Sequence, residues 1–141
     1  MLHHFPSSHT ARLIWKLPLL LLTGGVLYCA IEILFRGYTH ISMALCGALC
    51  FLLIYRLNQE KPNLLLPLRA LLSAALITGV EFAAGCILNL WLGLDIWDYS
   101  SMPYQLLGQI CLPFFCAWFL LGFPACLLCS LIRRFVFYEN V

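Results

Sequence analysis

The chain has 141 residues, of which 63% are apolar and only 10% are charged, with a net charge of +2. Soluble domains are about 45–50% apolar and about 25% charged, so this composition excludes an ordinary soluble protein. Most of the surface must therefore face lipid, and the length allows one domain. The small net charge gives no support for nucleic-acid binding.

Four apolar stretches are long enough to cross a bilayer as helices, because about 20 helical residues span the hydrocarbon core. They run at about 17–35, 41–57, 66–92 and 106–132, between an N-terminal segment at 1–16 and a tail at 133–141. Polar and apolar residues do not alternate along them, as they would in a lipid-facing barrel. The predicted fold class is all-α: a single transmembrane domain over residues 1–141, with four helices.

Two prolines fall inside the fourth stretch. Pro113 and Pro124 have no N–H to donate to the carbonyls of Gln109 and Leu120. A bend or a substitute donor is therefore expected at each position.

Lys and Arg are distributed unequally between the two sides of the predicted membrane domain. The N-terminal segment, the second connection and the tail carry seven of them, namely Arg12, Lys16, Arg56, Lys61, Arg69, Arg133 and Arg134. The first connection carries Arg36, and the third connection carries none. By the positive-inside rule, both termini are predicted to be cytoplasmic in a multi-pass protein of the cytoplasmic membrane.

Glu81 is the ionisable residue predicted to lie deepest in the membrane. A charge at mid-depth costs at least about 2.5 kcal/mol, so its presence needs a reason. Thr78, Glu81, Gly85 and Asn89 recur at spacings of three and four, which places them on one helix face. Two interpretations stay open: a structural glutamate that fixes helix packing, or a site that binds a proton or cation on a conduction path.

Three more candidate residues lie near the end of the first stretch. Glu32 precedes Arg36 by four residues, which is the favourable order for an intrahelical ion pair. His40 begins the second stretch at a similar level, where an interfacial hydrogen bond and a proton-relay role are both open.

Most of the polar candidates fall toward the predicted outer side, and the predicted inner half offers little beyond Thr23, Ser73 and Ser130. A polar vestibule with Glu81 at its floor would give this distribution, and so would a hydrogen-bonded cluster that orders the outer loop. The candidate substrate- or ion-binding residues are Glu81, Asn89, Glu32, Arg36, His40, Asp98, Gln105 and Gln109.

The third connection places two acids among aromatic residues, in Leu94-Asp95-Ile96-Trp97-Asp98-Tyr99-Ser100. Trp97 and Tyr99 are expected at headgroup depth, with Asp98 turned back toward Gln105 or Gln109. Asp98 or Ser100 is expected to cap the fourth helix, and a substrate-binding lid is the alternative.

No phosphate-cradling glycine loop and no hydrolase motif occurs in the sequence. We therefore expect no enzymatic activity, no ATP hydrolysis by this chain, no catalytic residue and no cofactor. The eight cysteines fall within the apolar stretches, where small, weakly polar side chains serve packing, so no metal site is expected.

One set of residues resembles a known family. It comprises Glu81-Phe82, Gly85, Asn89, Trp97-Asp98-Tyr99-Ser100, Pro103, Gly108-Gln109-Ile110-Cys111-Leu112 and Trp118-Phe119, with Arg36-Gly37-Tyr38-Thr39-His40-Ile41-Ser42-Met43 upstream. These residues resemble the small bacterial integral membrane proteins of the family described as Putative ABC-transporter type IV (CmpB-like). The resemblance implies a transporter membrane component in a bacterial cell membrane and a separate ATPase partner.

The sequence thus predicts a permease-like membrane subunit with a polar, outward-facing site around Glu81. Four helices enclose little volume, so a pathway would need a homo-oligomer or a partner protein in the bilayer. The alternative is an accessory or assembly protein that transports nothing and binds a membrane partner. A lipid-modifying enzyme using Glu81 and His40 as acid and base is a third reading, for which the sequence offers no nucleophile or metal set.

Overall fold

The computed structural model describes residues 9–139; residues 1–8 of the N-terminal segment, the side chains of residues 9–12, Arg12 among them, and residues 140–141 lie outside this description. The chain forms two compact units, with the boundary between Leu52 and Leu53. Glu32, Arg36 and His40 belong to the first unit. The remaining candidate residues belong to the second unit.

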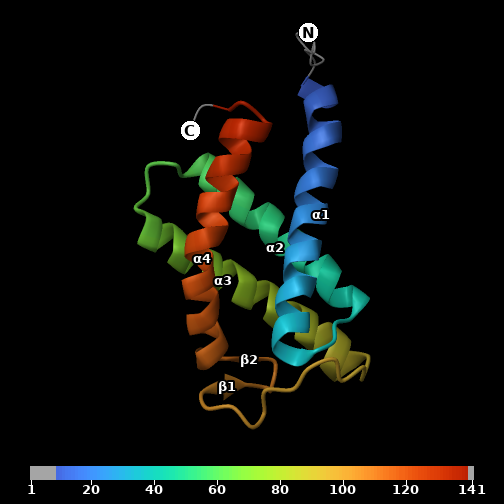
Figure 1. The fold of residues 1–141 in the computed structure, drawn as a ribbon. Coiled ribbons are helices and arrows are strands. Elements are labelled where there is room, and N and C mark those ends of the chain that lie inside the picture. The colour runs from blue at the N-terminus through green and yellow to red at the C-terminus, as the bar shows by residue number, and fades with distance from the viewer. Residues whose placement is uncertain (1–8, 140–141) are drawn as a thin grey trace. The chain divides into compact units, whose positions relative to one another are not determined.

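Helices dominate the described part of the chain (Figure 1). They are α1 (His9–Arg36), α2 (Ile41–Glu60), α3 (Leu66–Gly85) and α4 (Leu112–Leu131), and the π-helices η1 (Cys86–Trp91) and η2 (Ile132–Val136) continue α3 and α4. Four helical segments, Leu13–Arg36, Ile41–Glu60, Leu66–Trp91 and Leu112–Val136, are long and apolar enough to cross a membrane. The predicted four-helix membrane architecture is confirmed, and the protein is a multi-pass membrane protein.

The fourth helix begins at Leu112 and not at Leu106, as the apolar run had predicted. Two short antiparallel strands, β1 (Gln105–Leu106) and β2 (Ile110–Cys111), precede it. The turn between them has positive φ at Leu107 and Gly108, which a helix cannot accommodate. In addition, the Gly108 N–H donates to Oε1 of Gln105 at 2.7 Å. This hairpin places the side chain of Gln109 against the end of α3.

Pro113 accordingly lies in the first turn of α4, where a missing N–H costs nothing, and not inside the helix as predicted. The carbonyl of Gln109 still lacks a helical donor, and the indole Nε1–H of Trp97 supplies one at 3.0 Å. The expected substitute donor is therefore present at this carbonyl. Pro124 lies within α4, as predicted.

In the first unit, α1 and the first half of α2 pack through glycines. A Cβ on Gly24 would meet the carbonyl oxygen of Gly47 at 2.6 Å, and a Cβ on Gly47 would meet the Tyr28 side chain. Small residues allow two membrane helices to approach this closely, which increases their van der Waals contact.

In the second unit, α3 crosses α4, and the β1–β2 hairpin lies beside the start of α4 (Figure 1). Ser73 and Ala74 of α3 and Cys126 and Cys129 of α4 are fully buried. The unit thus has two ends: one formed by the 92–111 segment, which runs from η1 to α4, and one where α3 begins and α4 ends.

Candidate functional site

Glu81 lies on α3 with 5% of its surface exposed, and both of its carboxyl oxygens accept hydrogen bonds within the second unit. The hydroxyl of Tyr99, in the 92–111 segment, donates to Oε1 at 2.9 Å. The indole Nε1–H of Trp118, on α4, donates to Oε2 at 3.2 Å. One carboxyl group therefore connects α3, α4 and the connecting segment.

Asn89 and Gln109 make the next layer of hydrogen bonds, and both are buried. Nδ2 of Asn89 donates to Oε1 of Gln109 at 2.8 Å and to the carbonyl of Trp97 at 3.0 Å. Oδ1 of Asn89 accepts the backbone N–H of Ile96 at 2.7 Å. The amide group of Asn89 thus holds the 92–111 segment both through its Nδ2 donor and through its Oδ1 acceptor.

We call these hydrogen-bonded side chains the Glu81 cluster: Glu81, Asn89, Trp97, Tyr99, Gln109 and Trp118. The face predicted from the spacing in α3 explains why it forms here. Glu81, Gly85 and Asn89 are all buried, and Thr78, the fourth residue of the predicted face, is half-buried. A Cβ on Gly85 would lie 2.5 Å from Oε1 of Gln109, so only glycine leaves room for that amide.

Stacking adds to this attachment. The ring of Tyr99 lies on the ring of Phe114 with centroids 4.7 Å apart and an interplanar angle of 16°. Phe114 is in the first turn of α4, so Tyr99 contacts α4 through its ring and α3 through its hydroxyl. Aromatic pairs of this kind contribute about 0.5–1.5 kcal/mol beyond their buried area.

Trp97 is buried within the second unit, with 6% of its surface exposed. The reason is its N–H, which is used to satisfy the Gln109 carbonyl that Pro113 leaves open. The structure therefore places Trp97 inside the Glu81 cluster.

Asp98 and Gln105 are exposed and stabilise turns in the same segment. Oδ1 of Asp98 accepts the backbone N–H of Ser100 at 2.8 Å, and this bond lowers the pKa of the Asp98 carboxyl group below its ordinary value. The predicted turn of Asp98 toward Gln105 or Gln109 is replaced by this local bond. The cap role is also wrong, since the N-cap of α4 is Cys111, with no side-chain hydrogen bond.

In the first unit, Glu32 and Arg36 form the predicted ion pair, with Nη1 of Arg36 3.0 Å from Oε1 of Glu32. Thr39 donates its hydroxyl to the other oxygen, Oε2, at 2.8 Å. Nη2 of Arg36 donates to the hydroxyl of Tyr38 at 2.9 Å, and the guanidinium lies over that ring. The pair therefore orders the turn between α1 and α2.

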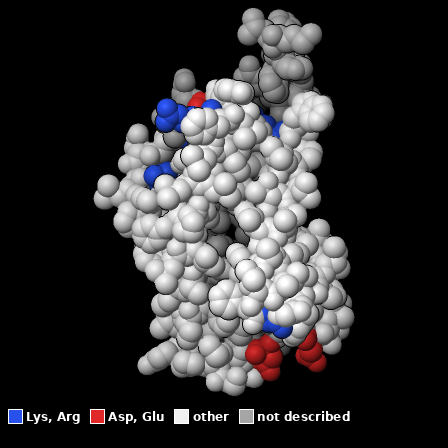
Figure 2. Space-filling view, viewed as in Figure 1, with Lys and Arg blue, Asp and Glu red and all other residues white. Residues whose placement is uncertain are grey.

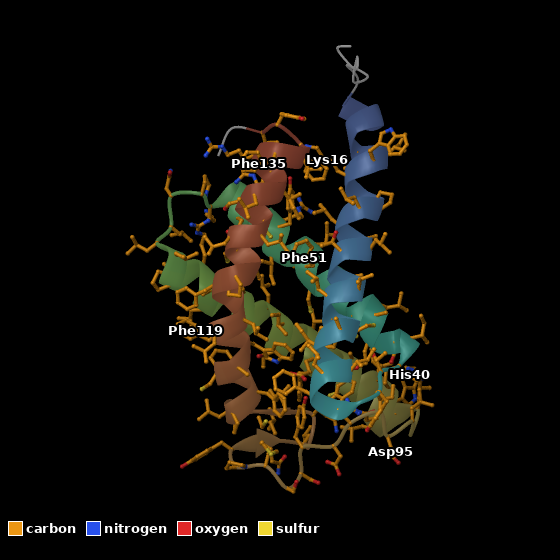
Figure 3. All side chains as sticks on the ribbon, viewed as in Figure 1. Lys16, His40, Phe51, Asp95, Phe119 and Phe135 are labelled. Atoms are coloured by element: carbon orange, nitrogen blue, oxygen red, sulfur yellow. The ribbon has the colours of Figure 1, made fainter. Side chains whose placement is uncertain are left out.

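His40 is exposed and precedes the first residue of α2 (Figure 3). Its Nδ1 accepts the backbone N–H of Ser42 at 3.2 Å and lies 2.7 Å from the Ser42 hydroxyl. This is the geometry of a residue that satisfies N–H groups at a helix start. Within residues 9–139, no group of three or more His, Cys, Asp or Glu side chains is arranged to hold a metal.

A second polar cluster, which the sequence did not indicate, lies where α3 begins and α4 ends. We call it the Asn58 cluster: Tyr55, Asn58, Arg69, Ser73, Cys126, Arg133 and Glu139. Asn58 is fully buried. Its Oδ1 accepts a bond from Nη1 of Arg69 at 2.8 Å, and its backbone carbonyl accepts one from Nη1 of Arg133 at 2.9 Å.

The C-terminal residues of the described chain complete this cluster. Oε2 of Glu139 accepts from Nε of Arg133 and from the hydroxyl of Tyr55, both at 3.1 Å. The Tyr55 ring also meets the Phe137 ring edge-on, with centroids 5.9 Å apart. The end of α4 is thereby fixed to the second half of α2.

The sequence carried signals for one cluster and not for the other. Tyr99 and Trp118 stand in the motifs that carry the family resemblance, although neither was proposed as a partner of Glu81. Asn58 lies just before the polar turn that follows α2. An amide side chain next to a polar turn is expected to be exposed, so nothing in the sequence indicated that Asn58 is buried. Its burial depends on α4, which is far away in sequence.

The family model described as Putative ABC-transporter type IV matches residues 42–138. The match includes all residues of the Glu81 cluster and begins inside the Arg36–Met43 motif. No curated protein and no solved structure matches the chain. Because the matched residues are well over half of the chain, this protein belongs to the Putative ABC-transporter type IV family.

Proposed function

We propose that this protein is a membrane subunit of a transporter, and that proton or cation binding at Glu81 controls how the 92–111 segment packs. The observation that carries this proposal is the position of the carboxyl group, whose two oxygens bond to two different elements. Family membership and the four membrane-spanning helices support the transporter class.

The chemistry follows from what protonation does to these bonds. An ionised carboxylate only accepts hydrogen bonds, and bonds to a charged acceptor are worth about 1.5–3 kcal/mol. Protonation removes the charge and converts one oxygen to a donor that faces a hydroxyl or an indole N–H. The connection of the segment to α3 and the contact between α3 and α4 would then weaken together.

Energy for transport would come from a separate ATPase, as the family name implies. The test is to capture the tagged full chain from its native membrane, place the complex in lipid vesicles, and measure ATP hydrolysis. We expect an ATP-hydrolysing partner. We also expect Glu81→Gln to keep that partner while its hydrolysis falls about tenfold, or about 1.4 kcal/mol.

Glu60→Gln is the matched control, because the Glu60 side chain is 61% exposed and pairs with Arg56 at the surface. Its expected effect on hydrolysis is less than about twofold. Full hydrolysis by a well-folded Glu81→Gln complex would remove Glu81 from the mechanism.

The second candidate function is an accessory or assembly protein that transports nothing. It is favoured by the internal use of the Glu81 cluster, in which Asn89 and Gln109 bond to each other and to the backbone of the 92–111 segment. A stable membrane partner without ATP hydrolysis, and with Glu81→Gln affecting only stability, would establish this function in place of the transporter.

A further inference from the structure

The ion pairs of the described arginines leave one half-buried guanidinium without a carboxylate. Arg36 pairs with Glu32, Arg56 with Glu60 and Arg133 with Glu139. Arg134 is exposed and can be hydrated. Arg69, in the first turn of α3, has no ion pair with any residue in the range 9–139.

The hydrogen bonds of Arg69 are also incomplete. Nη1 donates to Oδ1 of Asn58, a neutral amide, at 2.8 Å. Nε is buried and has no hydrogen-bond partner in the described chain. Nη2 has no bond to a described residue either, and it is not among the fully buried atoms. Asn58 thus anchors the guanidinium through Nη1, and Nη2 remains available to a ligand.

The surface around Arg69 is apolar. Leu65, Leu68 and Leu72 lie within one helical turn of it and have 77%, 42% and 37% of their surfaces exposed. In Figure 2, most of the face that is drawn carries neither Lys or Arg nor Asp or Glu, as expected for a surface in lipid. An anionic group with an attached apolar chain would fit both the cation and these leucines.

We propose that Arg69 anchors a binding site for a phosphate group, supplied by the headgroup of an anionic phospholipid. The N–H groups of a guanidinium form charge-assisted hydrogen bonds with phosphate oxygens, and Nη2 of Arg69 offers an accessible donor. The leucines would contact the acyl chains. Anionic headgroups recognised by basic residues between membrane helices follow the same electrostatic principle.

The experiment measures lipid binding to the purified full chain by native mass spectrometry. The probes are dioleoylphosphatidylglycerol, dioleoylphosphatidylcholine and inorganic phosphate. We expect the anionic lipid to bind about tenfold more tightly than the zwitterionic lipid, because the choline cation of the zwitterionic lipid lies beside its phosphate and offsets the attraction to Arg69. Inorganic phosphate at millimolar concentration should not displace it, because the phosphate ion lacks the acyl contacts.

Arg69→Gln should abolish this preference, while Arg134→Gln, which removes an exposed arginine at the same end, should change it less than about twofold. Arg69→Lys keeps the charge and should retain part of the preference, which separates loss of binding from loss of folding. If either Arg69 variant is not monodisperse, the lipid comparison on the wild-type chain decides.

Three outcomes would overturn the whole proposal, and a fourth would overturn the lipid source alone. One is equal binding of the two lipids by the wild-type chain. Another is an equal loss of preference in Arg134→Gln, which would indicate general surface charge. The last is release of a copurified protein by Arg69→Gln without any lipid preference, which would assign Arg69 to a carboxylate of that protein. Displacement of the lipid by inorganic phosphate in an Arg69-dependent manner would keep the phosphate site and overturn its lipid source.

Discussion

The indole N–H of Trp118 on α4 donates to Oε2 of Glu81 on α3, so a polar bond connects two membrane-spanning helices at a buried position. Both side chains have less than one tenth of their surface exposed. Hydrogen bonds between membrane helices are worth about 0.6–2 kcal/mol, and a carboxylate acceptor raises the value.

Trp118→Phe tests this bond, since it removes the donor and keeps an aromatic ring. We expect a loss of about 1–3 kcal/mol in the free energy of unfolding, from the missing donor and the smaller ring. Equilibrium unfolding in mixed micelles measures it. Trp91→Phe is the control, because Trp91 is 79% exposed, and a loss as large as that of Trp118→Phe would contradict the assignment.

Gly85→Ala tests the close approach of the 92–111 segment to α3. The added methyl would overlap the amide of Gln109. We therefore expect the free energy of unfolding to fall by about 1–3 kcal/mol and the β1–β2 hairpin to be displaced. The control is Gly79→Ala, where nothing lies within 4 Å, and helix propensity predicts a gain of up to about 1 kcal/mol. Thermal unfolding of the two variants should shift in opposite directions, and a parallel shift would argue against the contact.

Asn58→Leu tests the Asn58 cluster. Leucine has a similar size but cannot accept the hydrogen bond from Nη1 of Arg69. The half-buried guanidinium of Arg69 would then have lost its acceptor. We expect Asn58→Leu to lower the free energy of unfolding by about 2–4 kcal/mol. The neighbouring variant Gln59→Leu, at an exposed position, should change stability by less than about 0.5 kcal/mol. Similar losses in both variants would show that Asn58 has no special role.

The pKa of Asp98 gives a pH dependence with a definite sign. The Ser100 N–H bonds to the ionised carboxylate, so the pKa is lower in the folded than in the unfolded chain. The stabilisation is complete above the unfolded pKa and is lost as the pH falls through the folded value.

A carbon-13 titration of the Asp98 carboxyl group should therefore show a midpoint below that of an unfolded aspartate. Ser100→Ala should keep most of the shift, because the backbone N–H is its largest cause. A midpoint at or above the unfolded value would contradict the bond.

The sequence predicted the membrane helices well because hydropathy reports directly on burial in lipid. It also predicted the shared face of Glu81, Gly85 and Asn89, since helical spacing depends only on local geometry. The predicted start of the fourth helix was wrong because Leu106 and Leu107 are as apolar as the residues of α4 that follow. Only the positive φ at Leu107 and Gly108 keeps these two leucines out of the helix.

The Asn58 cluster could not be predicted in the same way. Asn58 meets Cys126 and Arg133 across long stretches of chain, and no spacing rule links these residues. Trp97 shows the related problem for aromatic residues: its indole N–H bonds to the Gln109 carbonyl that Pro113 leaves without a helical donor, and no spacing rule links these residues.

The position of Glu139 has a practical consequence for anyone shortening or tagging this chain. Its carboxylate is the acceptor shared by Tyr55 and Arg133, and it stands only two residues before the last residue, Val141. A protease site or a fluorescent-protein fusion placed upstream of residue 139 would therefore detach the end of α4 from α2, whereas an extension added after Val141 leaves that carboxylate in the chain.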